Sequence, residues 1–135
     1  MADVDPKARV VYSSKIKSFS WDPGSNLEVF TEAGMTVTIG FEGNVANIIL
    51  SGNIDYSMQE EIRNANQKAL SNEQVREICV DFKEVTFLDS SVIRALLTLQ
   101  KEATSKGKSL VLLNCKDNTR EVFEIGGFDR MFSFR

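Results

Sequence analysis

The segment Phe87-Leu88-Asp89-Ser90-Ser91 joins two different patterns of hydrophobicity. Before it, residues 75–82 are a short apolar run typical of a buried strand, and Phe87-Leu88 continues toward the aspartate. After it, apolar residues recur at helical spacing up to Gly107, a C-terminal helix signal. The stripe consists of Val92, Leu96, Leu99 and Ala103, widened by Ile93, Ala95 and Leu97. The segment therefore predicts a strand-to-helix junction, with a helix over residues 90–105.

A β-hairpin is predicted upstream of this junction. Residues 35–41 are rich in β-branched side chains, and residues 45–50 are a second apolar run. Gly43-Asn44 between them is a turn signal, so the two runs are expected to pair. Ser51-Gly52-Asn53-Ile54-Asp55 follows with the composition of a loop.

Two further helices and one further strand complete the pattern. Ser57 and Glu60 have capping-box spacing, which predicts a helix that starts at Ser57. Residues 110–113 read as another strand, and Asp117 or Asn118 is expected to cap a short third helix. The predicted buried face of the first helix is formed by Met58, Ile62, Ala65 and Ala69.

The order of these elements predicts an α/β fold. It reads β-β-α-β-α-β-α with a possible final strand, and strands that alternate with helices imply a mixed or parallel sheet with helices packed against it. The 135 residues fit one core, which we assign to residues 35–135. Residues 1–34 are expected to be an N-terminal extension that adds a strand, with strand-like patterns at 16–21 and 27–30.

Composition excludes several kinds of site. The chain has no histidine, which removes the commonest general base and the commonest zinc ligand. Cys79 and Cys115 lie far apart in apolar runs, which predicts two reduced core thiols rather than a disulfide or a metal pair. The net charge is −3, with scattered lysines and arginines, which argues against binding to nucleic acid. Neither a metal nor a cofactor is predicted.

The sequence also predicts a cytoplasmic protein without a membrane partner. The segment Met1-Ala2-Asp3-Val4-Asp5 is polar and acidic, unlike a signal peptide. No apolar run approaches the roughly 20 residues that a membrane-spanning helix needs.

The serines at the junction have two readings. In the simpler one, Asp89-Ser90-Ser91 does no more than start a helix. In the other, Ser90 accepts a phosphate, which the partial positive charge of a helix N-terminus favours. A catalytic serine is a poor alternative, because there is no histidine to activate it and no Gly-x-Ser-x-Gly motif around it.

Residues 35–134 resemble a STAS domain, the fold of bacterial anti-sigma factor antagonists. The resemblance rests on four motifs that occur in the family's order. They are Leu50-Ser51-Gly52-Asn53-Ile54-Asp55, Val80-Asp81-Phe82 with Val85-Thr86-Phe87-Leu88-Asp89-Ser90-Ser91, Gly107-Lys108-Ser109-Leu110-Val111-Leu112, and Val122-Phe123-Glu124-Ile125-Gly126-Gly127-Phe128 with Met131-Phe132.

This resemblance implies partner switching by a protein that is not an enzyme. An unphosphorylated antagonist binds an anti-sigma factor that is also a serine kinase, and so frees the sigma factor. The kinase phosphorylates the serine after the aspartate, here Ser90 with Ser91 as the fallback, and a PP2C-type phosphatase reverses the step. The expected partner-binding residues are Asp55, Asp89, Ser90, Ser91 and Arg94, on a protein that is a monomer or a weak dimer.

The sequence departs from the family pattern after the two serines. The family usually has glycine where this chain has Val92, followed often by Leu-Gly where it has Ile93-Arg94. A β-branched residue there predicts a stiffer, bulkier surface where a kinase must approach. The alternatives are a non-enzymatic STAS scaffold in a signalling assembly or a soluble regulatory domain of an anion transporter. An enzyme or small-ligand carrier has the least support.

Overall fold

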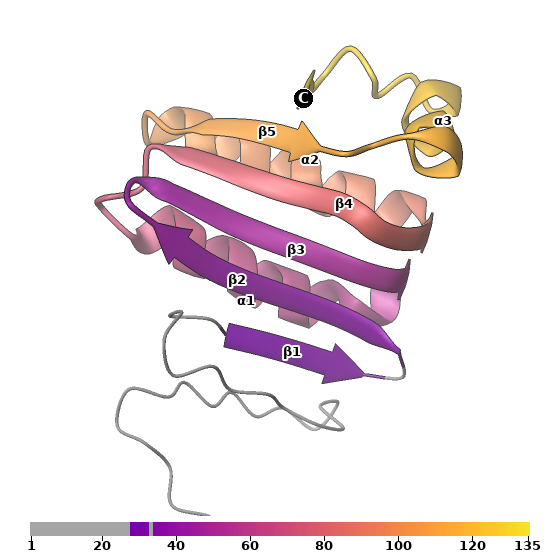
Figure 1. The fold of residues 1–135 in the computed structure, drawn as a ribbon. Coiled ribbons are helices and arrows are strands. Elements are labelled where there is room, and N and C mark those ends of the chain that lie inside the picture. The colour runs from indigo at the N-terminus through magenta and orange to yellow at the C-terminus, as the bar shows by residue number, and fades with distance from the viewer. Residues whose placement is uncertain (1–27, 33) are drawn as a thin grey trace, which may run out of the picture.

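A computed structural model describes residues 28–32 and 34–135, which form one six-stranded sheet with three α-helices (Figure 1). The predicted strand at 16–21 lies outside the described residues. The one predicted at 27–30 corresponds to the first strand of the sheet. The elements are β1 (Glu28–Glu32), β2 (Met35–Glu42), β3 (Val45–Ile54), the 3-10 helix η1 (Tyr56–Met58), α1 (Gln59–Ser71), β4 (Glu77–Leu88), α2 (Ser90–Ser105), β5 (Ser109–Leu113), α3 (Asp117–Ile125) and β6 (Ser133–Phe134).

The strands follow one another across the sheet in sequence order, β1-β2-β3-β4-β5-β6. β1, β2 and β3 pair antiparallel, whereas β3, β4, β5 and β6 pair parallel. Parallel neighbours need a crossover, and α1 and α2 supply the crossovers from β3 to β4 and from β4 to β5. Both helices lie on the same face of the sheet, behind it in Figure 1. The predicted α/β fold with a mixed sheet is confirmed.

The core lies between the sheet and these two helices. Ile39, Ile48, Val80 and Leu112 face one another in register across four strands, and all four are buried. The predicted helical stripes supply the other side of the core. Each buried valine, isoleucine or leucine among them stabilises the fold by roughly 1.5–3 kcal/mol through removal of its apolar surface from water, and each alanine by less. The helix residues concerned include Ile62, Ala65 and Ala69 of α1 and Val92, Leu96, Leu99 and Ala103 of α2.

An aromatic cluster fixes the C-terminal part of the chain to the sheet. The ring of Phe123 in α3 is fully buried and meets Phe82 of β4 edge-on, with 6.0 Å between ring centroids. Phe132 and Phe134 meet the same ring edge-on at 5.6 and 5.4 Å. These contacts hold α3 and β6 beside β4 and β5.

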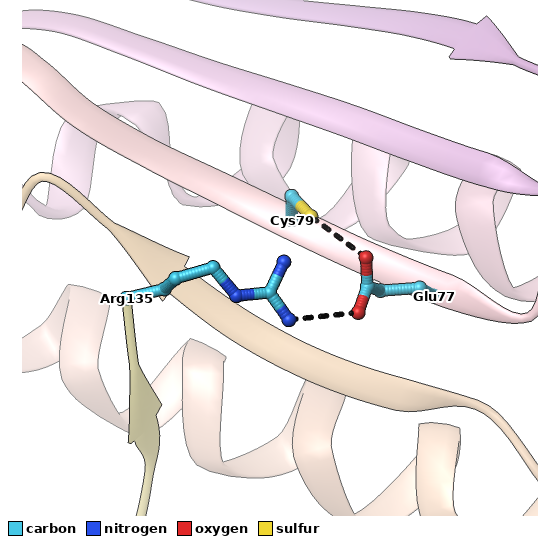
Figure 2. A network of polar contacts seen from close by, with 3 residues as sticks. All are labelled: Glu77, Cys79 and Arg135. Atoms are coloured by element: carbon cyan, nitrogen blue, oxygen red, sulfur yellow. Dashed lines mark hydrogen bonds and ion pairs between the residues drawn. The ribbon is translucent and has the colours of Figure 1, made fainter.

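Figure 2 shows a polar network on the sheet face opposite α1 and α2. An oxygen of Glu77 accepts a hydrogen bond from Arg135 at 3.1 Å, and its other oxygen lies 3.6 Å from the Cys79 sulfur. Burial, followed by the negative charge of Glu77, raises the pKa of the Cys79 thiol. Burial also raises the pKa of Cys115 to about 12. Both cysteines are free thiols, as predicted, but Cys115 is only partly buried.

Two strands are longer than the sequence pattern suggested. β3 continues through Ile54, so the loop expected from residue 51 is wrong for residues 51–54. These residues pair with the second half of β4, which is a single strand with two shifts of register opposite β3. Loop-forming residue types are tolerated here because pairing with the neighbouring strand β4 outweighs their weak intrinsic strand propensity.

Two predicted helix starts are also wrong. Ser57 lies inside η1 rather than at the cap of a long helix, and α1 begins at Gln59 after Met58, whose side chain makes no capping bond. α3 has Lys116 at its cap position, and Asp117 is its first residue, with a positive φ of 52°. In contrast, α2 spans Ser90–Ser105 with Asp89 as its cap, as predicted.

Candidate functional site

The ends of β3 and β4 lie side by side at one edge of the fold. Ile54 pairs with Leu88, and the backbone N–H of Asp89 donates to the carbonyl of Ile54 at 3.2 Å. Because parallel strands end at the same edge, the residues that follow them, Asp55 and Asp89, are brought together there. The edge so formed is the candidate site.

The same local motif follows each strand: an aspartate, any residue, then a serine. Asp55 Oδ1 accepts from the backbone N–H of Ser57 at 2.9 Å and from its hydroxyl at 2.5 Å. Asp89 Oδ1 accepts from the N–H of Ser91 at 2.8 Å and from its hydroxyl at 2.5 Å. Each carboxylate thus satisfies a free N–H at the start of a helix. The bonds from Ser57 also lower the pKa of Asp55.

Asp89 links the two helix starts. Its second oxygen, Oδ2, accepts the backbone N–H of Tyr56 at 3.3 Å. Its carboxylate therefore holds α2 through Ser91 and the start of η1 through Tyr56. Local sequence patterns missed this bond, since its two residues are 33 positions apart. The bond follows from the two parallel strands ending side by side, which no local spacing of residues indicates.

The two adjacent serines have different environments. Ser90 is the first residue of α2 and is exposed, and its hydroxyl has no hydrogen-bond partner among residues 28–32 and 34–135. Ser91 is partly buried, and its hydroxyl donates to Asp89. A modifying enzyme can reach the Ser90 hydroxyl without breaking the helix cap, which is not true of Ser91.

Exposed side chains of mixed character occur close to Ser90 in sequence or across the bond between Asp89 and Tyr56. Tyr56 is 70% exposed and Phe87 is 51% exposed, which is unusual for aromatic residues outside an interface. Arg94 is exposed one turn into α2. Val92, in contrast, is only 2% exposed and packs in the core. The expectation that Val92 makes the surface near Ser90 bulkier is therefore wrong.

A groove with a volume of about 710 Å³ lies between the η1–α1 segment and α2, and Tyr56 forms part of its wall. Its lining mixes apolar, amide and charged side chains, which suits contact with a protein surface better than it suits an enclosed apolar ligand. The remaining lining residues are Ser57, Gln59, Glu60, Arg63, Asn66, Gln67, Ala95, Thr98, Leu99 and Glu102.

Neither a cluster of metal ligands nor a membrane-spanning helix is found among residues 28–32 and 34–135. Residues 28–32 and 34–135 contain no group of three or more histidine, cysteine, aspartate or glutamate side chains placed to hold a metal ion. In the same part of the chain, no helix has both the length and the apolar character that crossing a membrane requires.

Comparisons with known proteins agree with this architecture. A STAS-domain containing protein of Pseudomonas aeruginosa (strain UCBPP-PA14) is 28% identical over 91 residues, which cover 67% of this chain and 88% of that one. The Bacillus cell fate determinant SpoIIAA in its phosphorylated form superposes with a TM-score of 0.59 at 24% identity, over 73% of this chain and 90% of that one. An anti-sigma factor antagonist from Mycobacterium paratuberculosis superposes with a TM-score of 0.66 at 18% identity, over 74% and 84%.

At these identities the structural matches establish the fold alone. The family assignment comes from the sequence, because residues 37–133 match the family described as "Mlab, STAS domain". That match covers most of the chain and includes the Asp89-Ser90-Ser91 junction. The chain therefore belongs to the STAS domain family.

Proposed function

We propose that this protein is an anti-sigma factor antagonist that works by partner switching. Unphosphorylated, it binds an anti-sigma factor that is also a serine kinase, and phosphorylation of Ser90 releases it. A PP2C-type phosphatase restores the binding form. The observation that carries the proposal is the exposed hydroxyl of Ser90, which has no hydrogen-bond partner among the described residues and lies directly after the capping Asp89, beside a Ser91 hydroxyl that is already engaged.

The surroundings of Ser90 explain how a phosphate would act. It adds about −1.5 to −2 charges next to the carboxylate of Asp89. A partner that covers Tyr56 and Phe87 would have to desolvate that charge beside apolar surface, which is costly. The helix itself tolerates the charge, because its N-terminus is partially positive. Phosphorylation is therefore expected to block binding while the fold stays intact.

A binding role also suits the chemistry of the site better than catalysis does. A serine nucleophile needs a base that can take its proton, and Asp89 is the carboxylate beside Ser90 in sequence. Both oxygens of Asp89 accept hydrogen bonds from other groups, Oδ1 from Ser91 and Oδ2 from Tyr56. We therefore infer that Ser90 is modified by another enzyme and is not itself a nucleophile.

The direct test is phosphorylation by the cognate kinase. The protein is incubated with that kinase and ATP, and the phosphate is located by mass spectrometry. Phosphate should appear on wild type and on Ser91→Ala, and should be lost in Ser90→Ala. Ser90→Ala should still bind the kinase, whereas phosphorylated wild type should not. Equal phosphorylation of Ser90→Ala and wild type would overturn the assignment.

A scaffold role is the second candidate, favoured by a separate apolar surface. Ile125 at the end of α3 is 81% exposed and Met131 is 51% exposed, both in the C-terminal part of the chain, away from the Ser90 junction in sequence. Exposed apolar side chains of this size are typical of contact sites. Light scattering that shows a large assembly, dissociated by Ile125→Ser but unaffected by Ser90→Asp, would favour a scaffold over a switch.

A further inference from the structure

Among the residues that the structure describes, Arg94 is the cation whose position on α2 suits a phosphate on Ser90. It lies four residues after Ser90 in α2, and residues with this spacing are neighbours on a helix surface. Helical side chains also tilt toward the N-terminus, so that of Arg94 leans back toward Ser90. Arg94 is exposed and has no ion-pair partner among residues 28–32 and 34–135.

The helix N-terminus supplies only a partial positive charge, and the neighbouring side chain at the helix start cannot complete the neutralisation of that phosphate. The carboxylate of Asp89 has the same sign of charge, and its oxygens accept from Ser91 and Tyr56. The backbone N–H of Ser91 is already donated to Asp89. A guanidinium, in contrast, offers two parallel N–H donors that match two phosphate oxygens.

We propose that Arg94 is the phosphate partner of Ser90, forming an ion pair along α2 only when Ser90 is phosphorylated. This inference rests on the proposed function, since it concerns the phosphorylated state of the same site. It assigns a role to Arg94, which stands where the family often has the glycine of Leu-Gly.

The pair would change the charge of the site in two ways at once. Without phosphate, Arg94 is an exposed cation available to an acidic group of a partner. With phosphate, the same cation is engaged by the Ser90 phosphate and is withdrawn from that partner. Phosphorylation thus adds a negative charge that the partner would have to desolvate. It also engages the positive charge of Arg94, which the partner could otherwise bind. Both effects favour release of the partner.

Phosphorus NMR tests the pair without the kinase. Phosphoserine is incorporated at position 90 during synthesis of the full chain, in wild type, in Arg94→Gln and in Lys101→Gln. Lys101 is a matched control, because it is an exposed cation on the same helix, about 16 Å along its axis from Ser90. The second pKa of the phosphate is then measured from its chemical shift against pH.

A nearby cation stabilises the doubly charged phosphate and lowers this pKa. Arg94→Gln should therefore raise it by about 0.2–0.4 of a pH unit. Lys101→Gln should leave it within about 0.1 unit, and 1 M NaCl should shrink the Arg94 effect. Equal pKa values for wild type and Arg94→Gln would overturn the pair.

Failure of the ion pair and failure of the proposed switch give different experimental results. If the kinase phosphorylates Ser90 but Arg94→Gln does not change the phosphate pKa, the switch stands and the ion pair is refuted. If the pKa shift is found but the kinase does not modify Ser90, the ion pair stands as a property of this helix and the proposed switch is refuted.

Discussion

Replacing Val92 with glycine, the residue usual in the family, should destabilise the protein severely. The Val92 side chain is 2% exposed and belongs to the core cluster, so its removal forfeits roughly 1.5–3 kcal/mol of burial. Glycine adds a cost of about 0.5–1 kcal/mol relative to alanine inside a helix. Val92→Ala should thus lose about 2 kcal/mol of unfolding free energy, and Val92→Gly about 3 kcal/mol.

Urea unfolding followed by circular dichroism measures these losses, provided the dependence on urea is the same for each variant. Arg94→Ala is the control, since it changes an exposed residue two positions further along α2 and should stay within about 0.5 kcal/mol of wild type. A loss below about 1 kcal/mol for Val92→Gly would show that the helix start rearranges around the substitution. The packing argument would then be refuted.

The Val92→Ala variant also tests whether Val92 affects recognition by the kinase or only the packing of the core. Because the Val92 side chain faces the core, its removal should leave the surface around Ser90 unchanged. The phosphorylation rate of the folded Val92→Ala protein should therefore stay within about twofold of wild type at a temperature where both are folded. A tenfold increase would mean that Val92 restricts kinase access, contrary to its burial.

Three further predictions follow from the site and from the buried thiol. Asp89→Ala should lose about 1 kcal/mol of stability through loss of the cap, with faster amide exchange at Tyr56; unchanged exchange would refute the bridge between the two helix starts. Asp55 should titrate below the usual 3.8 by carboxyl NMR, and the stability that it adds should be present above that pH and fall as pH drops through its folded pKa, a dependence absent in Asp55→Asn. Cys115, with its pKa raised to about 12 from 9.0, should be alkylated at least about tenfold more slowly at pH 9 than a free thiol, and a rate near that of the free thiol would contradict its burial.

Periodicity predicted the central helix well because several local signals agree there. Asp89 is a good cap, the stripe from Val92 to Ala103 has helical spacing, and Gly107 adopts the positive φ of 72° that commonly follows a helix end. The hairpin was predictable for the same reason, with Gly43 at a φ of 60° in its turn. These features depend on residues close in sequence.

The features that were missed or mispredicted depend mostly on partners distant in sequence, and in one case on a competing local partner. Residues 51–54 have loop-like types, yet they form a strand because β4 supplies hydrogen bonds opposite them. Ser57 looked like a cap because Glu60 has the right spacing, but the nearby Asp55 accepts its N–H and hydroxyl instead. The link from Asp89 to Tyr56 exists only because β3 and β4 end together.

Ser90 and Ser91 differ in their contacts at the start of α2, and this difference suits the proposed switch, in which Ser90 is phosphorylated while the fold stays intact. The helix cap needs one hydroxyl and one N–H near Asp89, and Ser91 supplies both. The Ser90 hydroxyl, on the same turn, makes no hydrogen bond within the part of the chain that the structure describes. A phosphate on Ser91 would break the bond between its hydroxyl and Asp89 and place two anions in contact, whereas a phosphate on the exposed Ser90 would leave that bond in place. The regulatory signal on Ser90 would therefore act on what binds the surface, while α2 and its cap remain in place.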